Sequence, residues 1–138
     1  MPTMSEAVYE GGCLCGAVRY RAQAAPLSAP YCHCSLCRRA AGAPVVAWAT
    51  FAVEDFAFTR GTPLRYASST RATRQFCGRC GSQLTFQYNE GATDIDVTIA
   101  TLDEPRRVAP TEHLWLGDRV PWLKIVDDLP RHERSRRS

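Results

Sequence analysis

Seven cysteines in three short groups constrain this chain more than any other feature of its sequence. Two cysteines lie at positions 13 and 15, three lie between positions 32 and 37, and two lie at positions 77 and 80. Such short spacing lets thiolates converge on one metal ion, whereas an odd count would leave one thiol over in a set of disulfides. The N-terminal MPTMSEAVYE has no basic segment followed by an apolar stretch. We therefore expect no secretory signal, a cytoplasmic location and metal binding rather than disulfides.

Ligand counting divides the cysteines into two sites. A structural zinc takes four tetrahedral ligands, and two of the cysteine groups together supply them. This pairing gives a closed four-cysteine site: Cys13, Cys15, Cys77 and Cys80. The remaining three would form a second site: Cys32, Cys34 and Cys37. Three thiolates leave one zinc position open, as in catalytic sites, so we expect two zinc ions per chain, one structural and one catalytic.

Three other arrangements remain open at this stage. His33 or a distant histidine would complete a second structural site, or the three cysteines would act as a redox cluster without metal. His33 stands between two cysteines, and in an extended strand its side chain would point away from them. We therefore expect it behind the ligands or at the surface. In a third arrangement, Cys34 and Cys37 would pair with Cys77 and Cys80, as in a zinc ribbon.

The rest of the sequence indicates a mainly β fold. Alternating or β-branched runs predict strands over residues 17–21, 45–51, 64–66, 74–76, 84–88 and 94–99, separated by glycine-rich turn signals. One short helix is predicted over residues 35–41, with Ser35 as N-cap and Gly42 after its end. After Asp103 the chain carries several prolines, and we expect Trp115 and Trp122 to hold this segment onto the sheet. Residues 1–7 are predicted to be an extension, residues 8–128 one domain, and residues 129–138 a basic, disordered tail.

Composition excludes several classes of partner. The 138 residues are 45% hydrophobic and carry a formal net charge of +3. Four of the basic residues lie in the last eight positions, so the body of the chain is close to balanced. We expect no nucleic-acid partner from so mild a charge, and no membrane span because no apolar run approaches about 20 residues.

Three cysteine motifs carry a resemblance to a known family. GGCLCGAVRY begins at Gly11, YCHCSLCRRAAGA at Tyr31 and FCGRCGSQLTF at Phe76. Weaker matches are DIDVTIATLDEP from Asp94 and PTEHLWLGDRVPW from Pro110. In this order the motifs resemble the glutathione-dependent formaldehyde-activating enzymes, a family that includes centromere protein V and has the Mss4-like fold.

The resemblance implies a fold, a metal assignment and an activity. The fold would be mainly β, with antiparallel sheets folded over each other around a structural zinc and one short helix. The resemblance assigns the first four cysteines to that zinc and Cys32, Cys34 and Cys37 to a catalytic metal. It also implies a carbon–sulfur lyase whose partner is a small thiol such as glutathione, and whose founding activity is condensation of glutathione with formaldehyde. Ala41 departs from the pattern, since many relatives have a serine there.

Further roles are assigned more loosely. Arg38 and Arg39 follow the three cysteines directly, and they would either bind a substrate carboxylate or remain solvated. His113 is a candidate general acid or base, with a structural role as the alternative. Side chains that would line an apolar cleft or pack in the core are Trp48, Phe51 and Trp115. The competing functions are a non-catalytic, zinc-stabilised module that binds a protein or nucleic acid, and a redox or metal-handling protein.

Overall fold

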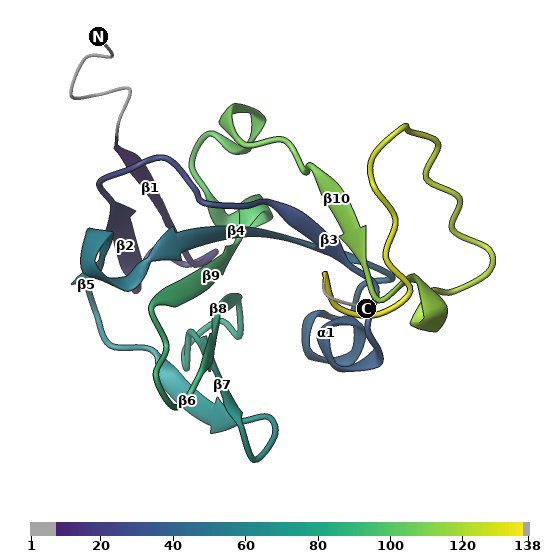
Figure 1. The fold of residues 1–138 in the computed structure, drawn as a ribbon. Coiled ribbons are helices and arrows are strands. Elements are labelled where there is room, and N and C mark those ends of the chain that lie inside the picture. The colour runs from purple at the N-terminus through teal and green to yellow at the C-terminus, as the bar shows by residue number, and fades with distance from the viewer. Residues whose placement is uncertain (1–7, 137–138) are drawn as a thin grey trace, which may run out of the picture.

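The computed structural model describes residues 8–136, which form ten strands and one α-helix (Figure 1). The strands are β1 (Tyr9–Gly12), β2 (Arg19–Ala22), β3 (Pro30–Cys32), β4 (Val46–Ala52), β5 (Phe56–Arg60), β6 (Leu64–Ala67), β7 (Ala72–Phe76), β8 (Gln83–Tyr88), β9 (Asp94–Thr98) and β10 (Glu112–Leu114). The helix is α1 (Ser35–Ala41). Four of these strands were not predicted from the sequence: β1, β3, β5 and β10.

The strands form two sheets. The smaller sheet has the order β1-β2-β5, and the larger has the order β10-β3-β4-β9-β8-β7-β6. All neighbours pair antiparallel except β10 and β3, which run parallel. The prediction of a mainly β fold with antiparallel sheets and one short helix is therefore confirmed.

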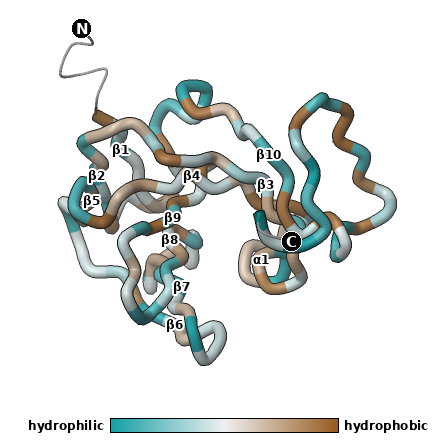
Figure 2. Tube along the Cα trace, viewed as in Figure 1, coloured by the Kyte–Doolittle hydropathy of each residue, from teal (hydrophilic) through white to brown (hydrophobic). Residues whose placement is uncertain are grey.

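Alternation along β4 gives the larger sheet two different buried faces. Ala49 and Phe51 lie in the main core with Tyr20 of the smaller sheet. Val46 and Trp48 instead belong to a second, smaller cluster that includes cysteine side chains. Successive residues of a strand point to opposite faces, so both sides of this strand are used. The hydropathy drawn in Figure 2 accordingly changes from residue to residue within single strands.

Helix α1 begins and ends at identifiable caps. Its N-cap is Cys34, whose Sγ accepts a hydrogen bond from the Cys37 backbone N–H at 3.3 Å. The expectation that Ser35 is the N-cap is wrong by one residue, because Ser35 already has helical geometry. Gly42 ends the helix in the left-handed conformation with φ of 63°, as predicted.

The C-terminal segment packs against β10. The His113 N–H donates to the Pro130 carbonyl at 2.9 Å, and the His132 N–H donates to the His113 carbonyl at 2.9 Å. The Trp115 N–H donates to the Arg134 carbonyl at 2.8 Å. This differs from the expected disordered tail, because the backbone groups at the free edge of β10 find partners here. Trp115 packs against the smaller buried cluster that contains Val46 and Trp48. Trp122 is 71% exposed, so the prediction that Trp122 anchors this segment is wrong.

Two further observations complete the fold. The predicted extension, residues 1–7, and residues 137–138 lie outside the described residues. Among the described residues, no helix has the length and apolar character needed to cross a bilayer.

Candidate metal centres

The first cysteine cluster joins two turns that are far apart in the sequence. Its members follow β1 or lie between β7 and β8, and their Sγ atoms all lie within 4.8 Å of one another: Cys13, Cys15, Cys77 and Cys80. The Cys15 Sγ lies 3.7 Å from that of Cys13 and 3.8 Å from that of Cys77. Sulfur atoms bound at 2.3 Å to one tetrahedral zinc ion are separated by about 3.8 Å, so this cluster has the dimensions of a metal site.

Backbone N–H groups stabilise thiolates in this first cluster. The Val18 N–H donates to the Cys13 Sγ at 3.2 Å, and the Arg79 N–H donates to the Cys77 Sγ at 3.3 Å. The Ser82 hydroxyl and backbone contacts lower the pKa of Cys80 to about 5. Hydrogen bonds to the charged form lower a pKa in this way. At Cys13 and Cys80 the local structure therefore lowers the pKa and favours the ionised state that metal binding requires.

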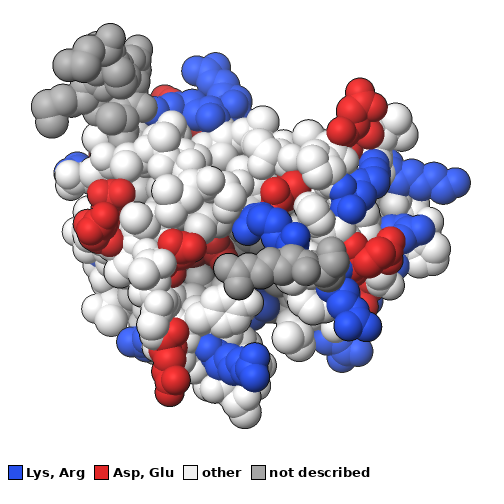
Figure 3. Space-filling view, viewed as in Figure 1, with Lys and Arg blue, Asp and Glu red and all other residues white. Residues whose placement is uncertain are grey.

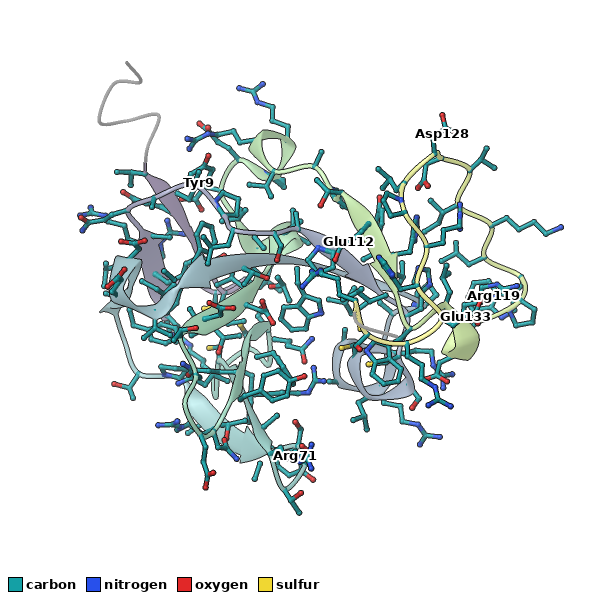
Figure 4. The ribbon with its side chains drawn as sticks, in the orientation of Figure 1. Tyr9, Arg71, Glu112, Arg119, Asp128 and Glu133 are labelled. Atoms are coloured by element: carbon teal, nitrogen blue, oxygen red, sulfur yellow. The ribbon has the colours of Figure 1, made fainter. Side chains whose placement is uncertain are left out.

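The second cluster is local in sequence and more buried. Cys32 ends β3, Cys34 caps α1 and Cys37 lies in the first turn of the helix, with their Sγ atoms within 4.8 Å of one another. Figure 4 shows sulfur atoms beside α1. Hydrogen bonds from Cys32 and Cys37 lower the pKa of Cys34 to about 2, while the same contacts raise that of Cys32. Three adjacent thiols compete for ionisation, so only a nearby positive charge allows all three to be thiolates.

The structure separates the two clusters and excludes disulfides within the described residues. All seven cysteines are free, and the grouping that would pair Cys34 and Cys37 with Cys77 and Cys80 does not occur. Among the described residues, no histidine or carboxylate joins the second cluster as a fourth ligand. The two groups obtained by counting ligands in the sequence are thus the groups that the fold brings together.

His33 points away from the cysteines into a buried chain of hydrogen bonds. Its Nε2 lies 2.9 Å from the Nδ1 of His113, and the Nε2 of His113 lies 2.8 Å from the Asp127 carboxylate. The carboxylate accepts, so the Nε2–H of His113 donates to Asp127, and a second hydrogen bond joins the Nε2 of His33 to the Nδ1 of His113. Burial and the neighbouring imidazole lower the pKa of His33 to about 4. The His33 ring is therefore neutral at pH 7.

His113 cannot serve as a general acid or base by direct contact, because its side chain is 0% exposed. Tyr31 stacks on its ring at 4.9 Å between centroids. The hydrogen-bonded chain instead ties the loop around the second cluster to the C-terminal segment. The sequence suggested a role for each histidine separately but gave no signal that the two side chains meet.

One face of the larger sheet leads to the second cluster. Residues directly opposite each other across five neighbouring strands share this face: Tyr66, Arg74, Phe86, Asp96 and Thr50. Side chains that oppose each other in antiparallel strands lie on the same side of the sheet. Burial raises the pKa of Asp96 to about 6, although the Thr50 hydroxyl donates to its carboxylate.

Sequence reasoning missed Arg74, which lies against the second cluster. Its side chain is only 5% exposed, and its Nη2 lies 3.5 Å from the Sγ of Cys37. The other terminal nitrogen donates to the Gln83 side chain at 3.1 Å. The guanidinium also lies over the rings of Phe86, at 4.9 Å, and Trp48, at 6.0 Å. In the sequence Arg74 is one of many arginines and lies in a predicted strand. Only the strand register reveals that it lies beside the second cysteine cluster.

The other predicted site residues differ in exposure. Arg38 is half-buried and Arg39 is exposed, both in the last turn of α1. Trp48 and Trp115 pack beside the second cluster, whereas Phe51 is fully buried in the main core and lines no cleft. On the face drawn in Figure 3, basic and acidic side chains are interspersed.

Comparison with known proteins places the chain among named relatives. The family model of the glutathione-dependent formaldehyde-activating enzymes matches residues 8–118. An uncharacterized lyase of Schizosaccharomyces pombe is 35% identical over 83 residues, which cover 60% of this chain and 60% of the yeast protein. A Halomonas elongata protein that bears the name of the same family is 31% identical over 127 residues, covering 84% of this chain and 80% of the relative.

A solved structure supports the fold. The crystal structure of a Rhodobacter sphaeroides protein superposes with a TM-score of 0.59 at 30% sequence identity. The match covers 73% of this chain and 91% of the other.

Proposed function

Because the chain belongs to the family of glutathione-dependent formaldehyde-activating enzymes, we propose that it is a zinc-dependent carbon–sulfur lyase acting on thiol adducts of an aldehyde or similar electrophile. The observation that carries this proposal is the contrast between the two cysteine clusters. One brings four thiols together, and the other brings three together without a fourth ligand among the described residues. A complete and an incomplete ligand set in one domain suit a structural and a catalytic role.

The donor atoms fit zinc at both clusters. Cys13, Cys15, Cys77 and Cys80 would hold the structural ion, and Cys32, Cys34 and Cys37 would hold the second. Thiolate donors favour zinc over magnesium or calcium, which take oxygen ligands. When bound at the second cluster, zinc supplies positive charge that favours the thiolate form of an added thiol and polarises a carbonyl group.

The protein's own residues would bind the substrate and exclude water. In the forward direction a thiol and an aldehyde combine to a hydroxyalkyl thioether: a carbon–sulfur bond forms, the carbonyl π bond and the S–H bond break, and the proton ends on the former carbonyl oxygen. Arg38 and Arg39 would pair with a carboxylate of a glutathione-type thiol, since guanidinium groups bind carboxylates well. Trp48 and Trp115 pack beside the cluster and shield it from water.

The proposal is tested by metal content together with exchange kinetics. The purified protein should contain about two zinc ions per chain, and NMR exchange spectroscopy should show faster exchange between free glutathione and its formaldehyde adduct. The Cys34→Ser variant should lose one zinc and the acceleration, because serine keeps the helix cap but not the thiolate. The control is Leu36→Ser, two positions away and 52% exposed, which should retain both properties.

Two results would contradict the proposal. A single zinc in the wild-type protein would remove the second site, and exchange at the uncatalysed rate with both zinc ions present would remove the lyase activity. In the latter case a zinc-stabilised binding module is the better description. Such a module, if it bound nucleic acid, would show an affinity that falls steeply with salt.

A further inference from the structure

Arg74 is a buried cation without a carboxylate partner. Its side chain is 5% exposed, and within the described part of the chain no aspartate or glutamate lies at ion-pair distance from it. Burying a lone charge is strongly unfavourable unless an opposite charge compensates it. The aromatic rings of Phe86 and Trp48 provide only weak compensation. The position of Arg74 therefore calls for a nearby anion.

The second cysteine cluster is the group that can supply this anion. The Nη2 of Arg74 lies 3.5 Å from the Cys37 Sγ. Three thiolates with one divalent zinc carry a net charge of −1, and Arg74 brings the total to zero. Addition of one external thiolate then gives −1 instead of −2. We propose that Arg74 is the resident counter-cation of the second cluster, and that it makes an anionic fourth partner, the substrate thiolate, bind in preference to a neutral one.

The inference deepens the proposed function and rests on it, and the two clusters differ as it requires. In the first cluster Cys13 and Cys77 are buried but Cys15 is exposed, so solvent reaches the charge there. In the second, Cys32 and Cys37 are buried and Cys34 is only partly exposed, so water is less able to stabilise the charge. A buried cluster needs a protein cation for the role that solvent performs at an exposed one.

Unpartnered donors around the second cluster point the same way. Buried nitrogen atoms without a hydrogen-bond acceptor in the described structure include Nε of Arg74, Nε2 of its partner Gln83 and Nε of Arg38 in α1. All three carry N–H groups, and none is an acceptor. An excess of buried donors beside thiol groups indicates a region that favours negative charge.

The test uses cobalt-loaded protein, in which a newly bound thiolate is seen directly as a sulfur-to-cobalt charge-transfer band. The probe is 2-mercaptoethanol, which has no carboxylate and therefore does not report on Arg38 or Arg39. Imidazole serves as the neutral probe at the same position. Three variants are compared with the wild type. Arg74→Met removes the charge but fills the slot between the rings, Arg74→Lys keeps the charge, and Arg65→Met removes an exposed arginine of β6 as a control.

Loss of the charge should act on the anionic probe alone. A unit charge several ångströms away at an effective dielectric constant of about 20–40 changes affinity about 10- to 100-fold, which is the expected loss of thiol affinity in Arg74→Met. Imidazole affinity, and both affinities in Arg74→Lys and Arg65→Met, should stay within about threefold of the wild type. If Arg74→Met does not fold, Arg74→Gln replaces it.

The outcomes separate the two proposals. Wild-type protein that binds two cobalt ions but no thiol contradicts the proposed function, and the role of Arg74 falls with it. Wild-type protein that binds thiol, with a neutral variant that binds it equally well, overturns the role of Arg74 alone. Equal losses for thiol and imidazole, or a lysine variant as weak as the neutral one, would show that Arg74 acts by packing rather than by charge, and would also overturn the inference.

Discussion

Removal of two ligands from the first cluster should destabilise the fold far more than removal of two from the second. The comparison is between the double variants Cys77→Ser/Cys80→Ser and Cys32→Ser/Cys34→Ser. In Cys32→Ser/Cys34→Ser, the Cys37 sulfur remains beside Arg74, so the variant does not leave Arg74 without a sulfur partner. The serine at position 34 keeps a hydroxyl at the helix cap, so the variant does not lose the cap either.

The expected magnitudes follow from the length of chain that each cluster closes. In the first cluster, Cys15 and Cys77 are 62 residues apart, and a cross-link over that length removes about 4 kcal/mol of unfolded-state entropy. The second cluster lies within residues 32–37, for which the same relation gives about 2 kcal/mol. For a domain of this size these values correspond to losses in Tm of about 15 °C and about 7 °C.

Thermal unfolding followed by circular dichroism, with zinc measured on the same samples, checks this prediction. Each double variant should lose one zinc ion, and the Cys77→Ser/Cys80→Ser protein should unfold at the lower temperature. Addition of a strong chelator to the wild type should lower its Tm at least as far as that variant. Equal Tm values for the two variants at equal zinc loss would refute the reasoning, because they would show that the first cluster does not act as a long-range cross-link.

The remaining predictions concern charge and backbone conformation. The hydrogen bond from His113 lowers the pKa of Asp127. The ionised Asp127 carboxylate therefore stabilises the fold above about pH 4, and this stabilisation is lost as the pH falls through the lowered pKa. Asp127→Asn should lower Tm at pH 7 and not at about pH 2. Burial raises the pKa of Asp96 to about 6. Ionisation of the buried Asp96 therefore destabilises the fold progressively as the pH rises from about 4 to above 6. Asp96→Asn should raise Tm at pH 7.5 and not at pH 4. Gly42→Ala should cost only the left-handed strain, about 1 kcal/mol in urea unfolding, because the added Cβ meets no atom within 4 Å. Gly61→Ala should cost clearly more, because its Cβ would clash with the backbone oxygen of Ala17. Similar costs for the two variants would contradict this account.

Local sequence signals were sufficient for the helix and for the long central strands. The run at 45–51 predicted β4, which the structure places at Val46–Ala52, and the short helix has the predicted bounds. The strands that were missed have three to five residues, and two of them, β5 and β10, pair with partners that are distant in sequence. For β10 the signal was masked by prolines on both sides, and its strand geometry comes from its parallel pairing with β3. Such strands are determined by tertiary pairing rather than by local propensity.

The site shows the same division between local and long-range information. Cysteine spacing predicted the short groups, because a short turn is a local property, whereas ligand counting and the family resemblance were needed to pair the groups. The positions of Arg74 and of the His33–His113 pair depend on strand register and on the return of the C-terminal segment, which no local pattern encodes. The assignment of substrate-binding roles to Arg38 and Arg39 stays a prediction.

Under the proposed function, one residue type performs two tasks in a single domain. Where the cysteines are distant in sequence and one of them is exposed, the main gain from a bound ion is chain closure, and a complete ligand set maximises it. Where the cysteines are adjacent in sequence and buried, chain closure contributes less to stability, so an incomplete ligand set loses little. The electrostatic cost then dominates, so the buried cluster requires a cation of its own, and Arg74 is placed to provide it. A relative of this chain with a neutral residue at that position should consequently favour a neutral partner at the three-cysteine cluster, which the same two probes would measure.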